Sequence, residues 1–139
     1  MNRAANVALF FLFLFAVSMG GCGGCGGCKG GPPGKQPALI ATYCFDNSNG
    51  TGQYTLTVNF QGTTTAASGP GKTSFSEFEM QQFTAGTRME CVAHRVYDLR
   101  SGGWNVKATP NGVGAPFSCP VNVPGSVTLD VSGSQPTCR

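Results

Sequence analysis

The sequence has little charge, one histidine, one tryptophan and no long hydrophobic run, and each shortage excludes a class of protein. Charged residues make up 11% of the 139 residues, and the basic ones are scattered, so neither a nucleic-acid-binding surface nor a nucleic-acid partner is expected. The longest apolar stretch, Val7 to Val17, has eleven residues, whereas a membrane-crossing helix needs roughly 18 to 20. A retained membrane helix would have to use Ala4 to Met19, which is also short.

Residues 1–21 have the layout of a secretory signal peptide, because Arg3 precedes the apolar stretch and small residues follow it. The next feature, Met19-Gly20-Gly21-Cys22, resembles the bacterial lipobox, in which a hydrophobic and two small residues precede a cysteine that receives diacylglycerol. The resemblance implies cleavage before Cys22 and lipid anchoring to a membrane of the cell envelope. Cleavage after Ser18 also fits the small-x-small rule and would give a secreted protein without lipid.

The seven cysteines leave an even number for pairing if Cys22 carries the lipid. Cys22, Cys25 and Cys28 are spaced like iron-sulfur ligands, but a fourth ligand is missing nearby. The Gly-Gly spacers would also lose much conformational freedom on closing such a site. We therefore expect neither a metal nor another cofactor, and we expect Cys25 and Cys28 to be modified further or joined to each other.

Residues 22–37 contain no large apolar side chain and are predicted to be a flexible tether, with a root-mean-square reach of about 20 to 24 Å. Residues 38–139 are predicted to form one domain. Removal of the leader takes Arg3 away and leaves eight basic and six acidic residues, a net charge of +2. This balance favours no strongly charged partner.

Alternation of apolar and polar residues predicts an all-β domain. It is clearest at 53–61, 104–108, 117–123 and 127–131, while 38–45 and 88–99 are apolar on both faces, as in buried strands. The segment Thr73–Phe83 is ambiguous, because Ser74 and Glu77 fit a capping box whereas an edge strand fits equally. About seven short strands separated by turn signals predict a single antiparallel β-sandwich.

Residues 99–108 resemble the strand-turn-strand of bacterial Ig-like and carboxypeptidase-regulatory-like (transthyretin-type) modules, which often reads Leu-x-Pro-Gly-x-Tyr-x-Val-x-Ala. Five residues match that pattern by type, although Ser101 stands where proline is usual: Leu99, Gly103, Trp104, Val106 and Ala108. The resemblance implies an Ig-like or prealbumin-like sandwich that serves as a non-catalytic spacer or binding platform. Alternation places Trp104 on the same face as Val106 and Ala108, so we expect its side chain to point inward.

Candidate catalytic residues are few. His94 has Asp98 four residues on but no G-x-S-x-G motif to serve, and Glu77 and Glu79 share one face of any strand, where a solvated edge is the simpler interpretation. The oxygen-rich segment Asp46–Thr51 departs from the EF-hand count and is expected to be a polar turn. We therefore predict no catalytic residue and no enzyme activity.

The remaining cysteines lie in or beside predicted strands, and their pairing cannot be deduced from spacing alone. We favour Cys44 with Cys91 and Cys119 with Cys138, because the last strand is expected to run antiparallel to its neighbour. The resulting hypothesis is a lipid-anchored envelope module that binds a protein or a polysaccharide, or contributes to envelope structure. A carbohydrate-binding module is the first alternative and a small exported hydrolase is the second. The first would require Tyr43, Tyr54, Tyr97 or Trp104 to be exposed in a row.

Overall fold

The computed structural model describes residues 33–49, 51–65 and 68–139, and the ordered elements in this part of the chain are all strands. The predicted all-β class is therefore confirmed. The strands are β1 (Leu39–Phe45), β2 (Gln53–Thr64), β3 (Ser74–Thr84), β4 (Glu90–Val96), β5 (Gly102–Asn111), β6 (Phe117–Val123), β7 (Gly125–Asp130) and β8 (Thr137–Cys138).

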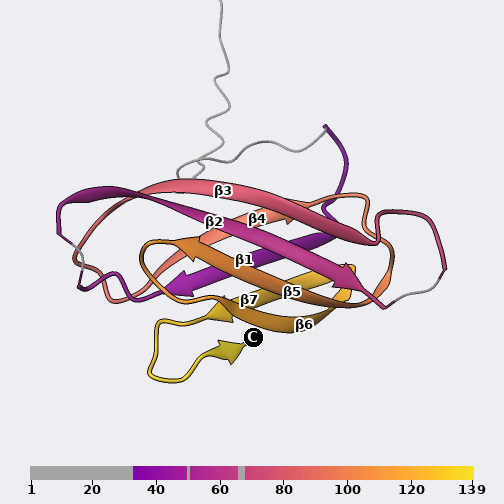
Figure 1. Ribbon diagram of the computed structural model, residues 1–139. Coiled ribbons are helices and arrows are strands. Elements are labelled where there is room, and N and C mark those ends of the chain that lie inside the picture. Colours follow the sequence, from indigo (N-terminus) through magenta and orange to yellow (C-terminus); the bar gives the residue numbers. More distant parts are fainter. Residues whose placement is uncertain (1–32, 50, 66–67) are drawn as a thin grey trace, which may run out of the picture.

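The strands form two packed four-stranded sheets, as the sequence predicts for a sandwich (Figure 1). Sheet A has the order β4-β1-β7-β8, and sheet B, which lies in front in Figure 1, has the order β3-β2-β5-β6. Neighbouring strands are antiparallel except β1 and β7, which are parallel. β1 and β2, the first strands of the two sheets in chain order, are both central. The edge strands are β4 and β8 in sheet A and β3 and β6 in sheet B.

Apolar side chains on the inner faces of both sheets make one core. Trp104 is 3% exposed and donates its indole N–H to the carbonyl of Arg100 at 2.8 Å, so the prediction that it points inward is confirmed. Gly62 of β2 makes room for a core ring, because a Cβ atom there would lie 2.2 Å from Cε1 of Phe75. The alternation of apolar and polar residues in β2 and β5 therefore reflects burial of one face of each strand.

Two disulfides hold the sandwich. Cys44 and Cys91 are directly opposite each other in β1 and β4, and their bond lies within sheet A. Cys119 and Cys138 join β6 of sheet B to β8 of sheet A. These are the two pairs favoured from the sequence.

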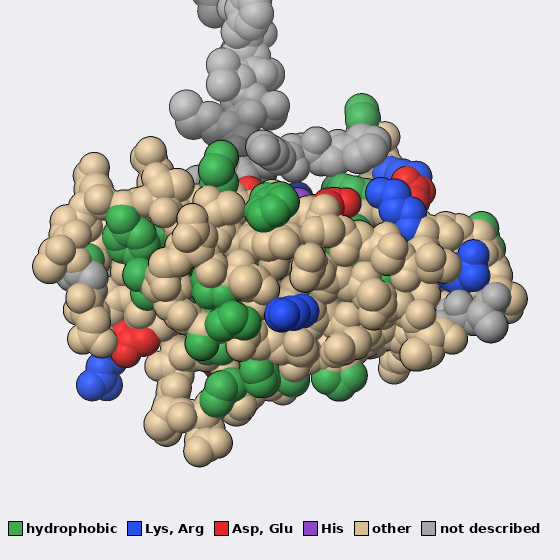
Figure 2. All heavy atoms as spheres, viewed as in Figure 1, with side chains coloured by type: hydrophobic (Ala, Val, Ile, Leu, Met, Phe, Trp, Pro, Cys, Tyr) green, Lys and Arg blue, Asp and Glu red, His purple; other side chains and the backbone are tan. Residues whose placement is uncertain are grey.

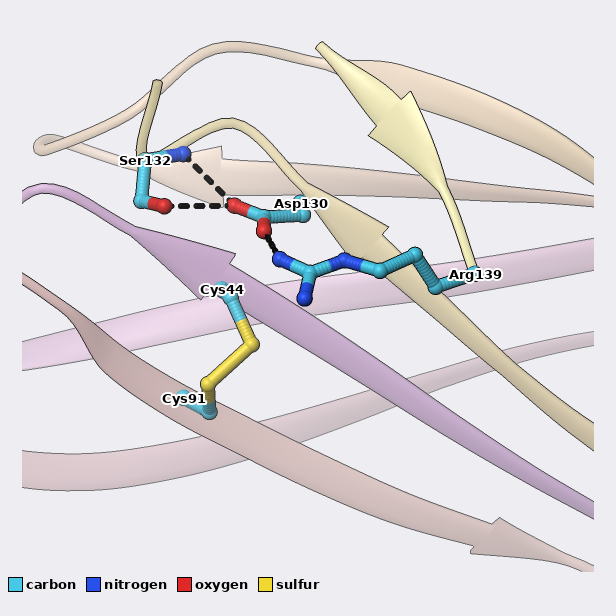
Figure 3. Close-up of a disulfide and its surroundings, with 5 residues drawn as sticks. All are labelled: Cys44, Cys91, Asp130, Ser132 and Arg139. Carbon is cyan, nitrogen blue, oxygen red and sulfur yellow. Dashed lines mark hydrogen bonds and ion pairs between the residues drawn. A yellow bond between two sulfur atoms is a disulfide. The ribbon is translucent and has the colours of Figure 1, made fainter.

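Asp130 at the end of β7 is a buried carboxylate close to the first of these disulfides (Figure 3). It lies beside Cys44 in the β1–β7 register. It accepts hydrogen bonds from the backbone N–H and the hydroxyl of Ser132, at 2.9 and 2.6 Å, and pairs with the guanidinium of Arg139. Burial of the carboxylate is therefore compensated by three donors.

Some segments differ from expectation. Thr73–Phe83 falls almost wholly within β3, a regular edge strand, so the helical interpretation of its capping box was wrong. The strand expected over 88–99 is the shorter β4, because the chain turns at Asp98, which has a positive φ of 59°. The signal peptide, the proposed lipid site and Cys25 and Cys28 lie outside the described residues. Within those residues, no helix is long and apolar enough to cross a membrane.

Candidate functional site

His94 lies between two glutamates at the seam where the edge strands of the two sheets meet. Glu77 and Glu79 of β3 are on the same face of the strand as the buried Phe75 and Phe83. Nδ1 of His94 is 2.9 Å from Oε2 of Glu79, and Nε2 is 2.7 Å from Oε2 of Glu77. The two carboxylates therefore face the interior and are not the solvated edge that the sequence suggested.

The cluster is largely shielded from water. The side chains of His94 and Glu79 are 15% and 16% exposed, and that of Glu77 is 35% exposed. The imidazole stacks on Phe60, with ring centroids 5.8 Å apart, and the ammonium of Lys72 is 4.0 Å from Oε1 of Glu77. Each ring nitrogen is thus within hydrogen-bonding distance of one carboxylate oxygen, and which nitrogen donates depends on the tautomer of the imidazole.

This arrangement suits a structural clamp better than catalysis. Each ring nitrogen is directed at a different carboxylate, so neither is available as a general base. No serine, threonine or cysteine is among the hydrogen-bond partners of His94 in the described part of the chain. Asp98, four residues after His94 in sequence, pairs instead with Lys35.

Nor do the described residues form a metal site. Throughout 33–49, 51–65 and 68–139, no group of three or more His, Cys, Asp or Glu side chains is placed to hold a metal ion. The Asp46 turn is closed by its own residues, since Oδ1 of Asp46 accepts hydrogen bonds from the backbone N–H and the hydroxyl of Ser48. These two hydrogen bonds lower the pKa of Asp46, and the bond from the hydroxyl has the larger effect.

The aromatic side chains considered for sugar stacking do not form an exposed row. Trp104 and Tyr43 are buried, while Tyr54 and Tyr97 are only partly exposed. The hydroxyl of Tyr43 donates to the carbonyl of Ala115 and accepts its N–H, at 2.8 and 2.9 Å. The hydroxyl of Tyr54 donates to Oδ1 of Asn47.

The exposed apolar side chains are ones that the sequence did not single out. Phe78 and Met80, on the outer face of β3, are 63% and 66% exposed, and Met89 in the following loop is 53% exposed. The outward position follows from the inward position of the two glutamates, because neighbouring residues in a strand face opposite sides. Inward-pointing charges are one means by which an edge strand avoids pairing with another chain.

Comparison with known proteins finds no matching family model, curated protein or solved structure. The site must therefore be interpreted from its own geometry. The two disulfides indicate that the domain belongs to an oxidising compartment outside the cytoplasm.

Proposed function

We propose that this protein is an exported lipoprotein, anchored to a membrane of the cell envelope through lipid on Cys22. Its β-sandwich acts there as a non-enzymatic binding or structural module. The observation that carries the proposal is the pair of disulfides, Cys44–Cys91 and Cys119–Cys138. Disulfides of this kind persist in exported proteins and are rare in cytosolic ones.

The cysteine inventory supports the lipid. The two disulfides use four of the seven cysteines, and Cys22 follows the apolar stretch and the lipobox-like tetrapeptide. The Gly-rich tether would separate the sandwich from the membrane surface by about 20 Å. A domain held in this way can reach an envelope protein or a polysaccharide while it stays attached.

A non-catalytic role is supported by the chemistry of the candidate site. His94 is the only histidine, and both of its nitrogens are engaged by glutamates that are themselves part of the β3–β4 seam. The resemblance of 99–108 to Ig-like and transthyretin-type modules favours the same role. The hydrolase alternative would need a hydroxyl beside His94, and the carbohydrate alternative would need a surface other than the buried Trp104.

Metabolic labelling with a radioactive fatty acid tests the anchor. We expect the wild-type protein to carry label and to fractionate with membranes, and Cys22→Ser to lose both properties. Cys25→Ser is the matched control, because it makes the same change three residues later and should keep the label. Label that survives in Cys22→Ser, or a wild-type protein that fractionates away from membranes, would contradict the proposal.

A further inference from the structure

A hollow of about 460 Å³ lies on sheet B where β2 ends and β5 begins. In Figure 1 these two strand ends are at the right-hand end of the sandwich. Two adjacent rows of outward-facing residues surround it. One row runs from Thr65 across Gly103 to Asn122, and the other contains Thr63, Asn105 and Pro120. Its volume is within the range of roughly 300 to 1,000 Å³ that is common for small-ligand sites.

The surface of the hollow is open at Gly103, which has no side chain. A Cβ atom at this position would have only Thr65 Oγ1 within 4 Å, at a distance of 3.9 Å, so the space above the glycine is open. Gly102, the preceding residue, has a positive φ of 126°, whereas Gly103 is not among the residues with positive φ. Glycine at 103 is therefore not required by the backbone conformation, and its effect is to leave room on the surface.

The groups around the hollow are uncharged, and apolar atoms of Trp104, Pro120 and Val121 line it beside polar ones. Asn105 and Asn122 each bring an amide, Thr63 and Thr65 bring hydroxyls, and Pro120 brings an apolar ring. Within the described residues, no hydrogen bond engages the side-chain amides of Asn105 and Asn122. Each amide offers a donor and an acceptor, which matches a pair of neighbouring hydroxyls on a sugar ring, since each hydroxyl can also donate and accept.

Most of the remainder of this face extends the same chemistry, and the exceptions are the exposed Phe78 and Met80 on the edge strand β3. Lys107 is the only charged residue that faces outward from the strands of sheet B; the other outward residues include Thr55, Asn59, Gln61, Thr109 and Ser118. In Figure 2, which views sheet B from outside, the middle of the face has few charged side chains. A nucleic acid would require many cations here, and a stable protein interface would require a larger apolar centre.

We propose that the Gly103 hollow binds one residue of a neutral polysaccharide, and that the adjoining uncharged face contacts the next residues of the same chain. This inference deepens the proposed binding role and rests on it. It does not use an aromatic platform. Hydrogen bonds from Asn105 and Asn122 select hydroxyls, and the missing side chain at 103 provides the depth.

The test is binding of the full mature protein, in detergent, to beads of cellulose, chitin and cross-linked dextran. Dextran sulfate beads provide an anionic polymer with the same backbone. We expect saturable binding to at least one neutral polymer that persists at high salt. Gly103→Val should project a branched side chain into the hollow and weaken binding at least tenfold, and Asn105→Ala or Asn122→Ala should weaken it about 3- to 10-fold, the value of one hydrogen bond.

Gln135→Ala is the control, because Gln135 is an exposed side-chain amide between β7 and β8 of the other sheet, and its binding should equal that of the wild type. If Gly103→Val fails to fold, as judged by circular dichroism, the two asparagine variants decide the result. No binding to any of the neutral polymers, binding only to dextran sulfate, or binding unchanged in the variants would overturn the inference. None of these results would affect fatty-acid labelling at Cys22, so the two proposals fail separately.

Discussion

Cys119 in β6 and Cys138 in β8 are bonded across the two sheets, with Cα atoms 5.7 Å apart. β8 contributes only two register pairs to β7, so its position depends on this bond and on the pair that Arg139 makes with Asp130. The opposite seam, between β3 and β4, has no covalent link within the described residues. It is held by His94 and its two glutamates. One side of the sandwich is thus closed by a disulfide and the other by hydrogen bonds between side chains.

Removal of the inter-sheet disulfide is expected to lower the free energy of unfolding by about 3 kcal/mol, the loop-closure value for a separation of this size. The variant is Cys119→Ala with Cys138→Ala, measured by urea unfolding. The matched comparison is Cys44→Ala with Cys91→Ala. This bond joins residues 47 apart in sequence, whereas the inter-sheet bond joins residues 19 apart. Its removal should therefore cost more, about 4 kcal/mol. Unfolding curves that coincide with the wild type would contradict both values.

Trp104→Ala is expected to cost about 3 to 5 kcal/mol, because it leaves a cavity in the core and leaves the Arg100 carbonyl without its indole donor. The wild-type fluorescence should be blue-shifted and poorly quenched by iodide, since Trp104 is the only tryptophan and is 3% exposed. Trp104→Phe retains the apolar ring and should cost less. Emission like that of free tryptophan would show that the indole is in water.

Much of the fold could be predicted because burial of one face leaves a direct mark on the sequence. Residues 53–60 and 104–108 alternate without exception, and β2 and β5 are the central strands of sheet B. The alternation in β3 has the opposite sense in its middle, with Glu77 and Glu79 inside and Phe78 outside. That reversal depends on His94, a residue of the other sheet, and no local pattern could reveal it.

The candidate sites show the same division. The sequence drew attention to His94, Glu77 and Glu79 one by one, but their meeting is a consequence of how the two edge strands pack. The Gly103 hollow was missed altogether. Its signal was the additional glycine before Trp104, which differs from the Leu-x-Pro-Gly pattern, but a glycine in a turn region has several ordinary causes. Only the register between β5 and β6 places Asn122 opposite Gly103.

His94→Ala is expected to reduce the free energy of unfolding by about 1 to 3 kcal/mol, because Glu77 and Glu79 lose their shared hydrogen-bonding partner. The same substitution in a Glu77→Gln, Glu79→Gln background should cost less, since the carboxylates that bond to the imidazole are gone. Urea unfolding of the four proteins forms a double-mutant cycle. Equal costs in both backgrounds would show that the three residues do not interact.

Deletion of the tether is expected to leave the stability of the domain almost unchanged. The described contact that it removes is the Lys35–Asp98 pair, whose side chains are 49% and 54% exposed, and such pairs contribute about 0 to 1 kcal/mol. A chain beginning at Ala38 should therefore melt like the mature protein. A chain beginning at Ile40 loses the buried Leu39 and should melt lower. A large loss in the first chain would mean that the tether packs on the domain.

Alkaline pH is expected to destabilise the domain through Tyr43. Burial raises the pKa of its hydroxyl to about 12, although the backbone hydrogen bond with Ala115 acts in the opposite direction. Between the ordinary value of 10.0 and about 12, the unfolded chain loses this proton while the folded chain keeps it. The free energy of unfolding therefore falls as pH rises through that window, by about 1 kcal/mol between about pH 9 and about pH 11 and by about 2 to 3 kcal/mol in total above it. Tyr43→Phe should show a smaller fall in the free energy of unfolding. Tyr54 still contributes to the fall in that variant, because burial and the charge of Glu90 raise the pKa of Tyr54. Urea unfolding at about pH 9 and about pH 11 measures the difference, and equal falls in both proteins would exclude Tyr43 as the cause.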